Sequence, residues 1–180
     1  MRLVSLLAVA ASTVALSLGT GLAAPPVAAT ACGGALPAGL AVPAGNELAF
    51  ELQAEGVQVY ACGATGGAFA WTFQAPEAKL FGPDGQPAGS HGAGPTWESS
   101  DGSKVVGAKV EGATPDSSAI PWLLLRSASH AGGGRMAEVT FVQRVRTSGG
   151  NAPAVGCDAA HVGAVARVAY RAAYCFYRAK

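Results

Sequence analysis

The chain has 180 residues, of which 50% are hydrophobic and 13% are charged, and its formal net charge is +1 at pH 7. A hydrophobic chain with so few charges is not an intrinsically disordered protein. Because no basic stripe runs along the sequence, nucleic acid is not expected as a partner.

Residues 1–31 are predicted to be a secretory signal peptide. Arg2 supplies a positive charge, an apolar run extends from Leu3 to Leu18, and small residues at 29–31 offer a cleavage site just before Cys32. We therefore expect an N-terminal signal helix, export to the periplasm or the extracellular space, and no membrane span after cleavage. Two alternatives stay open: residues 3–24 are long enough for a transmembrane helix, and Cys32 could be the acylated cysteine of a lipoprotein.

The rest of the chain is predicted to be a flexible lead-in at residues 32–46 and a single β domain at residues 47–178. Alternating hydrophobic residues predict strands, because successive side chains of a strand point to opposite faces. We expect strands at residues 47–53, 57–62, 69–73, 78–81, 120–126, 136–146 and 168–178, three shorter ones within 90–112, and one short helix within 158–166. A turn at Glu55–Gly56 would join the first two strands. Roughly nine short strands at this spacing predict an all-β fold, either an antiparallel β-sandwich or a barrel.

The strand expected at residues 136–146 has an apolar face that carries Val139, Phe141 and Val145. Arg144 and Arg146 are assigned to the opposite face of this strand. Gln143 falls on the apolar face, where we expect its side chain to satisfy a buried backbone group.

One stretch near the middle of the chain is the richest in distinctive side chains. Gly92–Pro95 cannot continue a strand, because proline lacks the backbone donor and glycine favours a positive φ. If these four residues form the loop of a hairpin, His91 lies opposite Thr96, and His91, Thr96 and Glu98 share one face. Trp97 then lies on the other face, although a shift of one residue in register would exchange the two faces. The candidate binding residues are His91, Thr96, Trp97 and Glu98.

Two classes of function follow from this patch. The favoured one is an exported, non-catalytic β domain that binds a small molecule, a glycan or a protein. The alternative is a hydrolase or a metal-dependent enzyme that uses His91 and Glu98. We assign no catalytic residue, metal ligand or cofactor, because His130 and His161 lie far along the chain and a metal site usually has three or more convergent ligands. The sequence leaves the oligomeric state open.

Several segments together resemble a known family. They are V-P-A-G-N at 42–46, G-V-Q-V-Y-A-C at 56–62, A-P-E-A-K-L at 75–80, H-G-A-G-P-T-W-E at 91–98, I-P-W-L-L-L at 120–125, V-Q-R-V-R-T-S-G-G-N-A-P at 142–153 and A-A-Y-C-F-Y at 172–177. In this order they resemble the exported bacterial and fungal family known as domain of unknown function 3455. The resemblance extends from Pro43 to Tyr177, and it implies no activity because the family has none established.

Four cysteines, at positions 32, 62, 157 and 175, all follow the expected signal peptide. Export makes disulfides possible, and four cysteines allow three pairings that spacing alone cannot separate. The resemblance implies a bridge between Cys62 and Cys157, at positions where the family often has cysteine.

Overall fold

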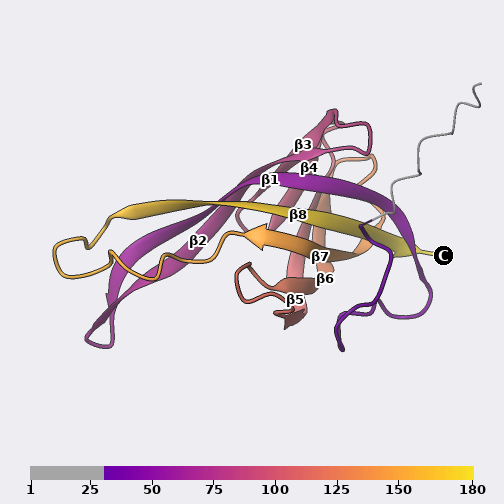
Figure 1. Cartoon of the computed structure of the whole chain (residues 1–180). Helices are drawn as coiled ribbons and strands as arrows, with labels where there is room; N and C mark the ends of the chain where they lie inside the picture. Colours follow the sequence, from indigo (N-terminus) through magenta and orange to yellow (C-terminus); the bar gives the residue numbers. More distant parts are fainter. Residues whose placement is uncertain (1–30) are drawn as a thin grey trace, which may run out of the picture.

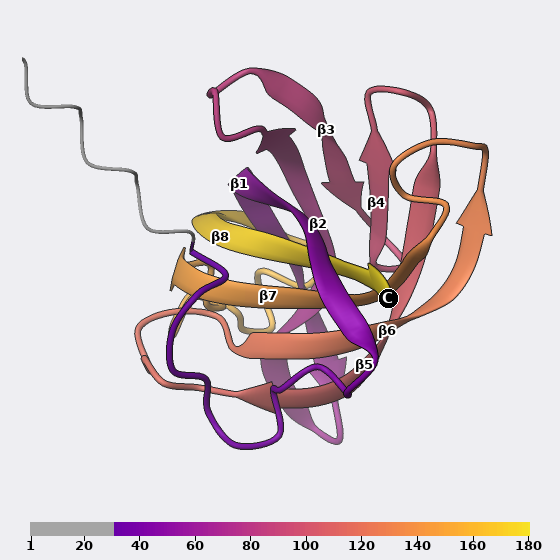
Figure 2. The same cartoon turned by 90° about the vertical axis from the view of Figure 1, so that its right-hand side faces the viewer.

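Eight antiparallel strands form the fold of residues 31–180, the part of the chain that the computed structural model describes. The strands are β1 (Asn46–Thr65), β2 (Ala68–Phe81), β3 (Pro87–Gly92), β4 (Thr96–Ser99), β5 (Lys104–Ala113), β6 (Trp122–Ala131), β7 (Val139–Gly149) and β8 (Val165–Ala179). Each strand pairs with the next, and β8 pairs with β1, so the sheet closes into a barrel (Figures 1 and 2). The all-β prediction is confirmed, in its barrel form. The expected signal helix falls on residues 1–30, outside the described part of the chain.

The strands are fewer and longer than expected, because Gly56 is not in a turn. It lies inside β1, paired with Ala78 of β2 on one side and with Tyr170 of β8 on the other. A Cβ atom at this position would lie 2.1 Å from the carbonyl oxygen of Glu77. Glycine is therefore needed here for a close approach of two backbones and not for a positive φ. The expected hairpin at Glu55–Gly56 was wrong, and the segments 69–73 and 78–81 are likewise parts of one strand, β2.

The helix expected within residues 158–166 is also absent from the structure, which has turns there before β8 begins. The Asp158 carboxylate accepts hydrogen bonds from the backbone nitrogen of Ala160 and from the His161 ring. Gly163 has a φ of 87° and donates its backbone N–H to the carbonyl of Cys62. Local side-chain bonds of this kind compete with helix formation in a short segment. Residues 31–180 include no helix that could cross a membrane.

The barrel interior is filled mainly by aromatic side chains of β8 and β4. Tyr170, Tyr174 and Phe176 of β8 point inward and are nearly inaccessible to solvent. Trp97 of β4, only 1% exposed, packs edge-on against the rings of Tyr174 and Phe176 at centroid distances of 5.3 and 6.1 Å. An eight-stranded barrel has an interior just wide enough to be filled by side chains or to hold one small ligand. Free space inside the barrel is therefore expected only where these rings do not reach.

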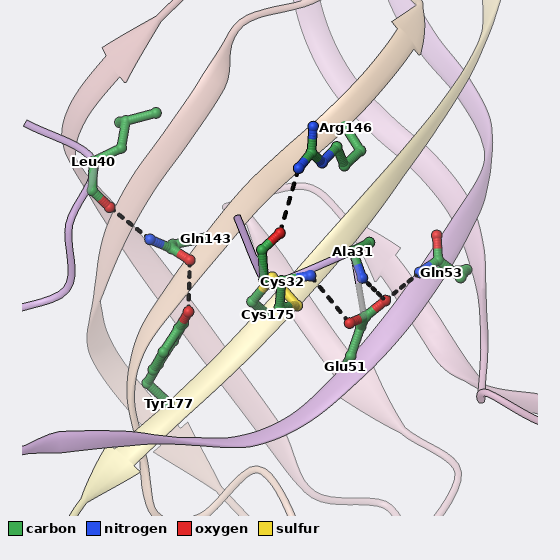
Figure 3. The surroundings of a disulfide bond; sticks show 10 residues. Ala31, Cys32, Leu40, Glu51, Gln53, Gln143, Arg146, Cys175 and Tyr177 are labelled. Carbon is green, nitrogen blue, oxygen red and sulfur yellow. Dashed lines mark hydrogen bonds between the residues drawn. A yellow bond between two sulfur atoms is a disulfide. The ribbon is translucent and has the colours of Figure 1, made fainter. Parts of the chain in front are cut away.

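A second core lies outside the barrel, under the lead-in. Leu40 is fully buried in a cluster with the outward-facing residues Trp122, Leu124 and Val145. The Gln143 amide donates to the Leu40 carbonyl at 2.6 Å, which confirms that this glutamine satisfies a buried backbone group (Figure 3). The lead-in is thus packed along the barrel wall without regular secondary structure, instead of being free.

The disulfide Cys32–Cys175 fixes the start of the lead-in to β8 (Figure 3). The carboxylate of Glu51 accepts hydrogen bonds from the backbone nitrogens of Ala31 and Cys32 beside it. A sulfur atom in a disulfide cannot also carry a lipid through a thioether bond. The lipoprotein alternative with Cys32 as the acylated residue is therefore incompatible with the structure.

A second disulfide, Cys62–Cys157, is the bridge that the family resemblance implied. It joins β1 to the loop before β8, where the far ends of β1 and β2 extend to the lower left in Figure 1. The Trp71 indole nitrogen also donates to the carbonyl of Val155 in this loop, at 2.9 Å. None of the cysteines in residues 31–180 is free. Two disulfides are typical of proteins in an oxidising, exported environment.

Candidate functional site

A cavity of about 430 Å³ opens at one end of the barrel, and we call it the mouth cavity. It is more enclosed than two other depressions of about 430 and 480 Å³ on the surface. Much of its lining is hydrocarbon or aromatic, contributed by Tyr60, Phe73, Pro76, Pro95, Ile120, Pro121, Leu123 and Leu125. Its polar lining residues are Gln58, Gln74, His91, Lys109 and Arg144. A carbon-lined space of this size with a few convergent polar groups is typical of a small-molecule site.

His91 lines this cavity from the end of β3, and its register differs from the expected one. The β3–β4 hairpin pairs Gly92 with Thr96 and His91 with Trp97. Only three residues, 93–95, therefore form the loop, and the expected four-residue loop was wrong. Because of this one-residue shift, His91 and Trp97 share the inward face, with ring centroids 4.6 Å apart. His91 is only 4% exposed.

Thr96 and Glu98 lie on the outward face of the same hairpin. The Glu98 carboxylate forms an ion pair with the Lys104 ammonium at 2.9 Å, and both side chains are nearly half exposed. Thr96 contributes only its backbone carbonyl, which lies 2.9 Å from Nδ1 of His91. The structure thus brings His91 and Trp97 together and separates both from Glu98. A His91–Glu98 pair for acid–base or metal chemistry does not exist in this geometry, and no group of metal-binding side chains occurs elsewhere in residues 31–180.

The hydrogen bond to Thr96 fixes the state of the His91 ring. A carbonyl oxygen only accepts, so Nδ1 of His91 carries the hydrogen. The pKa of His91 is lowered to about 4, mainly by burial; the bond to Thr96 partly opposes this effect, and the nearby Arg144 charge adds a smaller lowering. His91 is therefore neutral at pH 7, and its Nε2 lone pair is an acceptor on the wall of the mouth cavity.

Gln58 and Arg144 are two of the four polar lining residues that were not predicted as site residues. Gln58 is 2% exposed, and its Nε2 donor has no partner in the described structure. Arg144 is half-buried on β7 and donates from Nε to the Pro121 carbonyl at 3.0 Å.

The alternation in β7 placed Arg144 on the face opposite the apolar one. Phe141 and Val145 of the apolar face pack with Leu40 of the lead-in, and the face with Arg144 points into the barrel. Val139 lies beyond a register shift and belongs to the barrel core instead.

A family model with the description "Protein of unknown function (DUF3455)" matches residues 43–178. The chain belongs to this family. The match includes all of β1 to β7 and nearly all of β8, and hence every residue that lines the mouth cavity. A search of curated proteins and a search of solved structures found no match.

In this DUF3455 domain the Glu98–Lys104 pair should be dispensable. Glu98→Gln should change the free energy of unfolding by less than about 1 kcal/mol, because an exposed ion pair gains little in water. Chemical denaturation of the variant beside the wild type measures this. A loss of several kcal/mol would mean that Glu98 has a structural role that its half-exposed position does not suggest.

Proposed function

We propose that this protein is an exported, non-catalytic binding domain that holds a small molecule in the mouth cavity. The observation that carries the proposal is a carbon-lined space with a buried, unpartnered donor, Nε2 of Gln58, at its wall. An unpaired buried polar group costs about 1–3 kcal/mol, which a bound acceptor would recover. His91 offers a second polar contact in the same cavity: its Nε2 accepts a hydrogen bond, whereas Nε2 of Gln58 donates one.

Two features favour a small molecule over a glycan. Sugar-binding surfaces use exposed aromatic rings, often of tryptophan. Trp97 and Trp122 are only 1% and 8% exposed, and Trp71 does not line the cavity, which leaves Phe73 as its largely exposed ring. The mouth cavity is also concave and more enclosed than the other two depressions, which suits a compact ligand better than an extended one. An enzyme is disfavoured because His91 has no carboxylate beside it and no nucleophile is placed against it.

Export is supported by the two disulfides and by the signal peptide predicted from the sequence. Disulfides persist in oxidising compartments and are rare in reducing ones. A ligand-binding domain in this setting would meet its ligand in the cell envelope or outside the cell.

The neutral fluorescent probe N-phenyl-1-naphthylamine tests the proposal. The oxidised protein should bind about one probe molecule with an increase in fluorescence, and Leu123→Trp, which adds a large ring to the cavity wall, should weaken binding about tenfold or more. Val165→Trp is the matched control, because Val165 is 61% exposed and does not line the cavity. If neither the wild type nor the control binds the probe, or if Leu123→Trp binds it as well as they do, the mouth cavity is not the binding site.

A further inference from the structure

We propose that the ligand of the mouth cavity is an organic anion, with a hydrocarbon body in the cavity and a carboxylate paired with Arg144. This inference rests on the proposed function, because it assigns a chemical class to the ligand of the same cavity. Three observations carry it: the charges on the cavity wall, the position of Arg144, and the placement of hydrocarbon around it.

The charges that line the mouth cavity are all positive. Lys109 and Arg144 are among its lining residues, and no aspartate or glutamate is. In the described part of the chain, five ion pairs are formed, and neither Lys109 nor Arg144 takes part in any of them. Four other cations of the described chain do pair with a carboxylate, as Arg167 does with Glu77 and Arg178 with Glu47. A negative ligand would supply the missing counter-charge.

Arg144 is held in a position that suits a carboxylate. Its Nε–H is occupied by the Pro121 carbonyl, which fixes the plane of the guanidinium. The two terminal nitrogens, which lie near the Tyr174 hydroxyl, form no ion pair in the described chain and can offer donors to the two oxygens of a carboxylate. A half-buried charge without an opposite charge beside it is unfavourable, and cations in such positions are usually paired with a carboxylate. The charge of Arg144 also acts on the cavity wall, where it opposes the burial that raises the pKa of Tyr60 and Tyr174.

The hydrocarbon part of the ligand would lie on the apolar walls. Leu123 and Leu125 come from β6, next to Arg144 on β7, because Leu123 pairs directly with Arg144 in the sheet. Phe73 and Pro95 line the same cavity from β2 and from the β3–β4 loop. An anion bound at Arg144 would therefore have apolar wall immediately beside it. This arrangement favours an amphiphilic anion over a simple inorganic one.

Displacement of N-phenyl-1-naphthylamine by ligands with the same chain length tests the charge preference. Decanoate should displace the probe at a concentration at least about tenfold lower than decanol, as expected for a charge-assisted hydrogen-bonded pair. Decylamine should be no better than decanol, because its ammonium meets two cations. Sodium 2-naphthoate, tested beside decanoate, distinguishes an aromatic from an aliphatic body. Added salt should weaken the binding of decanoate and leave that of decanol nearly unchanged.

Three variants assign the preference to one residue. Arg144→Met should reduce the preference for decanoate over decanol to less than about threefold while decanol still displaces the probe, and Arg144→Lys should retain part of the preference. Arg126→Met is the matched control, because Arg126 is an exposed, unpaired arginine of β6 that does not line the cavity. If the probe binds but decanoate and decanol compete equally, or if Arg126→Met has the same effect as Arg144→Met, the anion assignment is overturned and the binding function remains. If the probe does not bind to the folded wild type, the binding function itself fails.

Discussion

Replacing all four cysteines by alanine should lower the free energy of unfolding by about 9 kcal/mol, enough to unfold most domains of this size. Each disulfide removed alone should cost about 4 kcal/mol. The reason is that the two bonds are nested, since Cys62–Cys157 lies within the loop that Cys32–Cys175 closes. While one bond remains, the other closes a loop of only about 50 residues, the 30 from Cys32 to Cys62 and the 18 from Cys157 to Cys175. The first bond to form closes a loop of 95 or 143 residues and restricts the unfolded chain more.

Guanidinium unfolding followed by tryptophan fluorescence measures these losses. The pair Cys32→Ala with Cys175→Ala and the pair Cys62→Ala with Cys157→Ala are compared with the wild type and with the four-alanine variant. Alanine suits Cys175, which is completely buried among apolar residues. A four-alanine variant no less stable than the two paired variants would contradict the chain-entropy argument.

The sequence predicted the class of the fold because alternation is a local signal. Along β8 the alternation placed Tyr170, Tyr174 and Phe176 on one face, and these residues do fill the barrel. Closure of the barrel rests on pairs such as Gly56 with Tyr170, which are more than 100 residues apart and leave no local trace. Gly56 also misled the strand assignment, because a glycine required by a close backbone approach cannot be told from a turn glycine in one sequence.

The candidate site was predicted only in part, for two physical reasons. His91, a predicted binding residue, lines the mouth cavity, but its neighbour on the inward face was not predicted, because a loop shorter by one residue changes which side chains of the two strands share a face. Arg144 was assigned to the face opposite the apolar one, and alternation alone does not tell which of the two faces meets the barrel interior. On β7 Phe141 and Val145 are covered by Leu40, and the lead-in that carries Leu40 has no periodic pattern to reveal this.

The second large effect concerns pH. Between pH 6.5 and about 4 the wild type should lose about 3 kcal/mol of unfolding free energy through His91 alone. The pKa of this ring falls from 6.5 to about 4 on folding, mainly because the ring is buried, and each unit corresponds to about 1.4 kcal/mol. Above about pH 7.5 the ring is neutral in both states and contributes no slope. Below that pH the unfolded chain takes up a proton that the folded chain does not, so stability falls as the pH falls.

The variant His91→Asn separates this effect from the titration of carboxylates. Asparagine keeps an amide donor near the Thr96 carbonyl but does not titrate. The variant should therefore be less stable than the wild type at pH 7, and its free energy of unfolding should stay nearly constant between pH 6.5 and 5. Asp116 and Asp158, whose pKa values are lowered by hydrogen bonds to Ser118 and His161, retain their ordinary effect below about pH 4 in both proteins. Denaturation curves at half-unit intervals from pH 4 to 8 give the difference between the two proteins. A difference that stays constant across this range would show that the His91 ring gains a proton in the folded barrel as readily as in the unfolded chain.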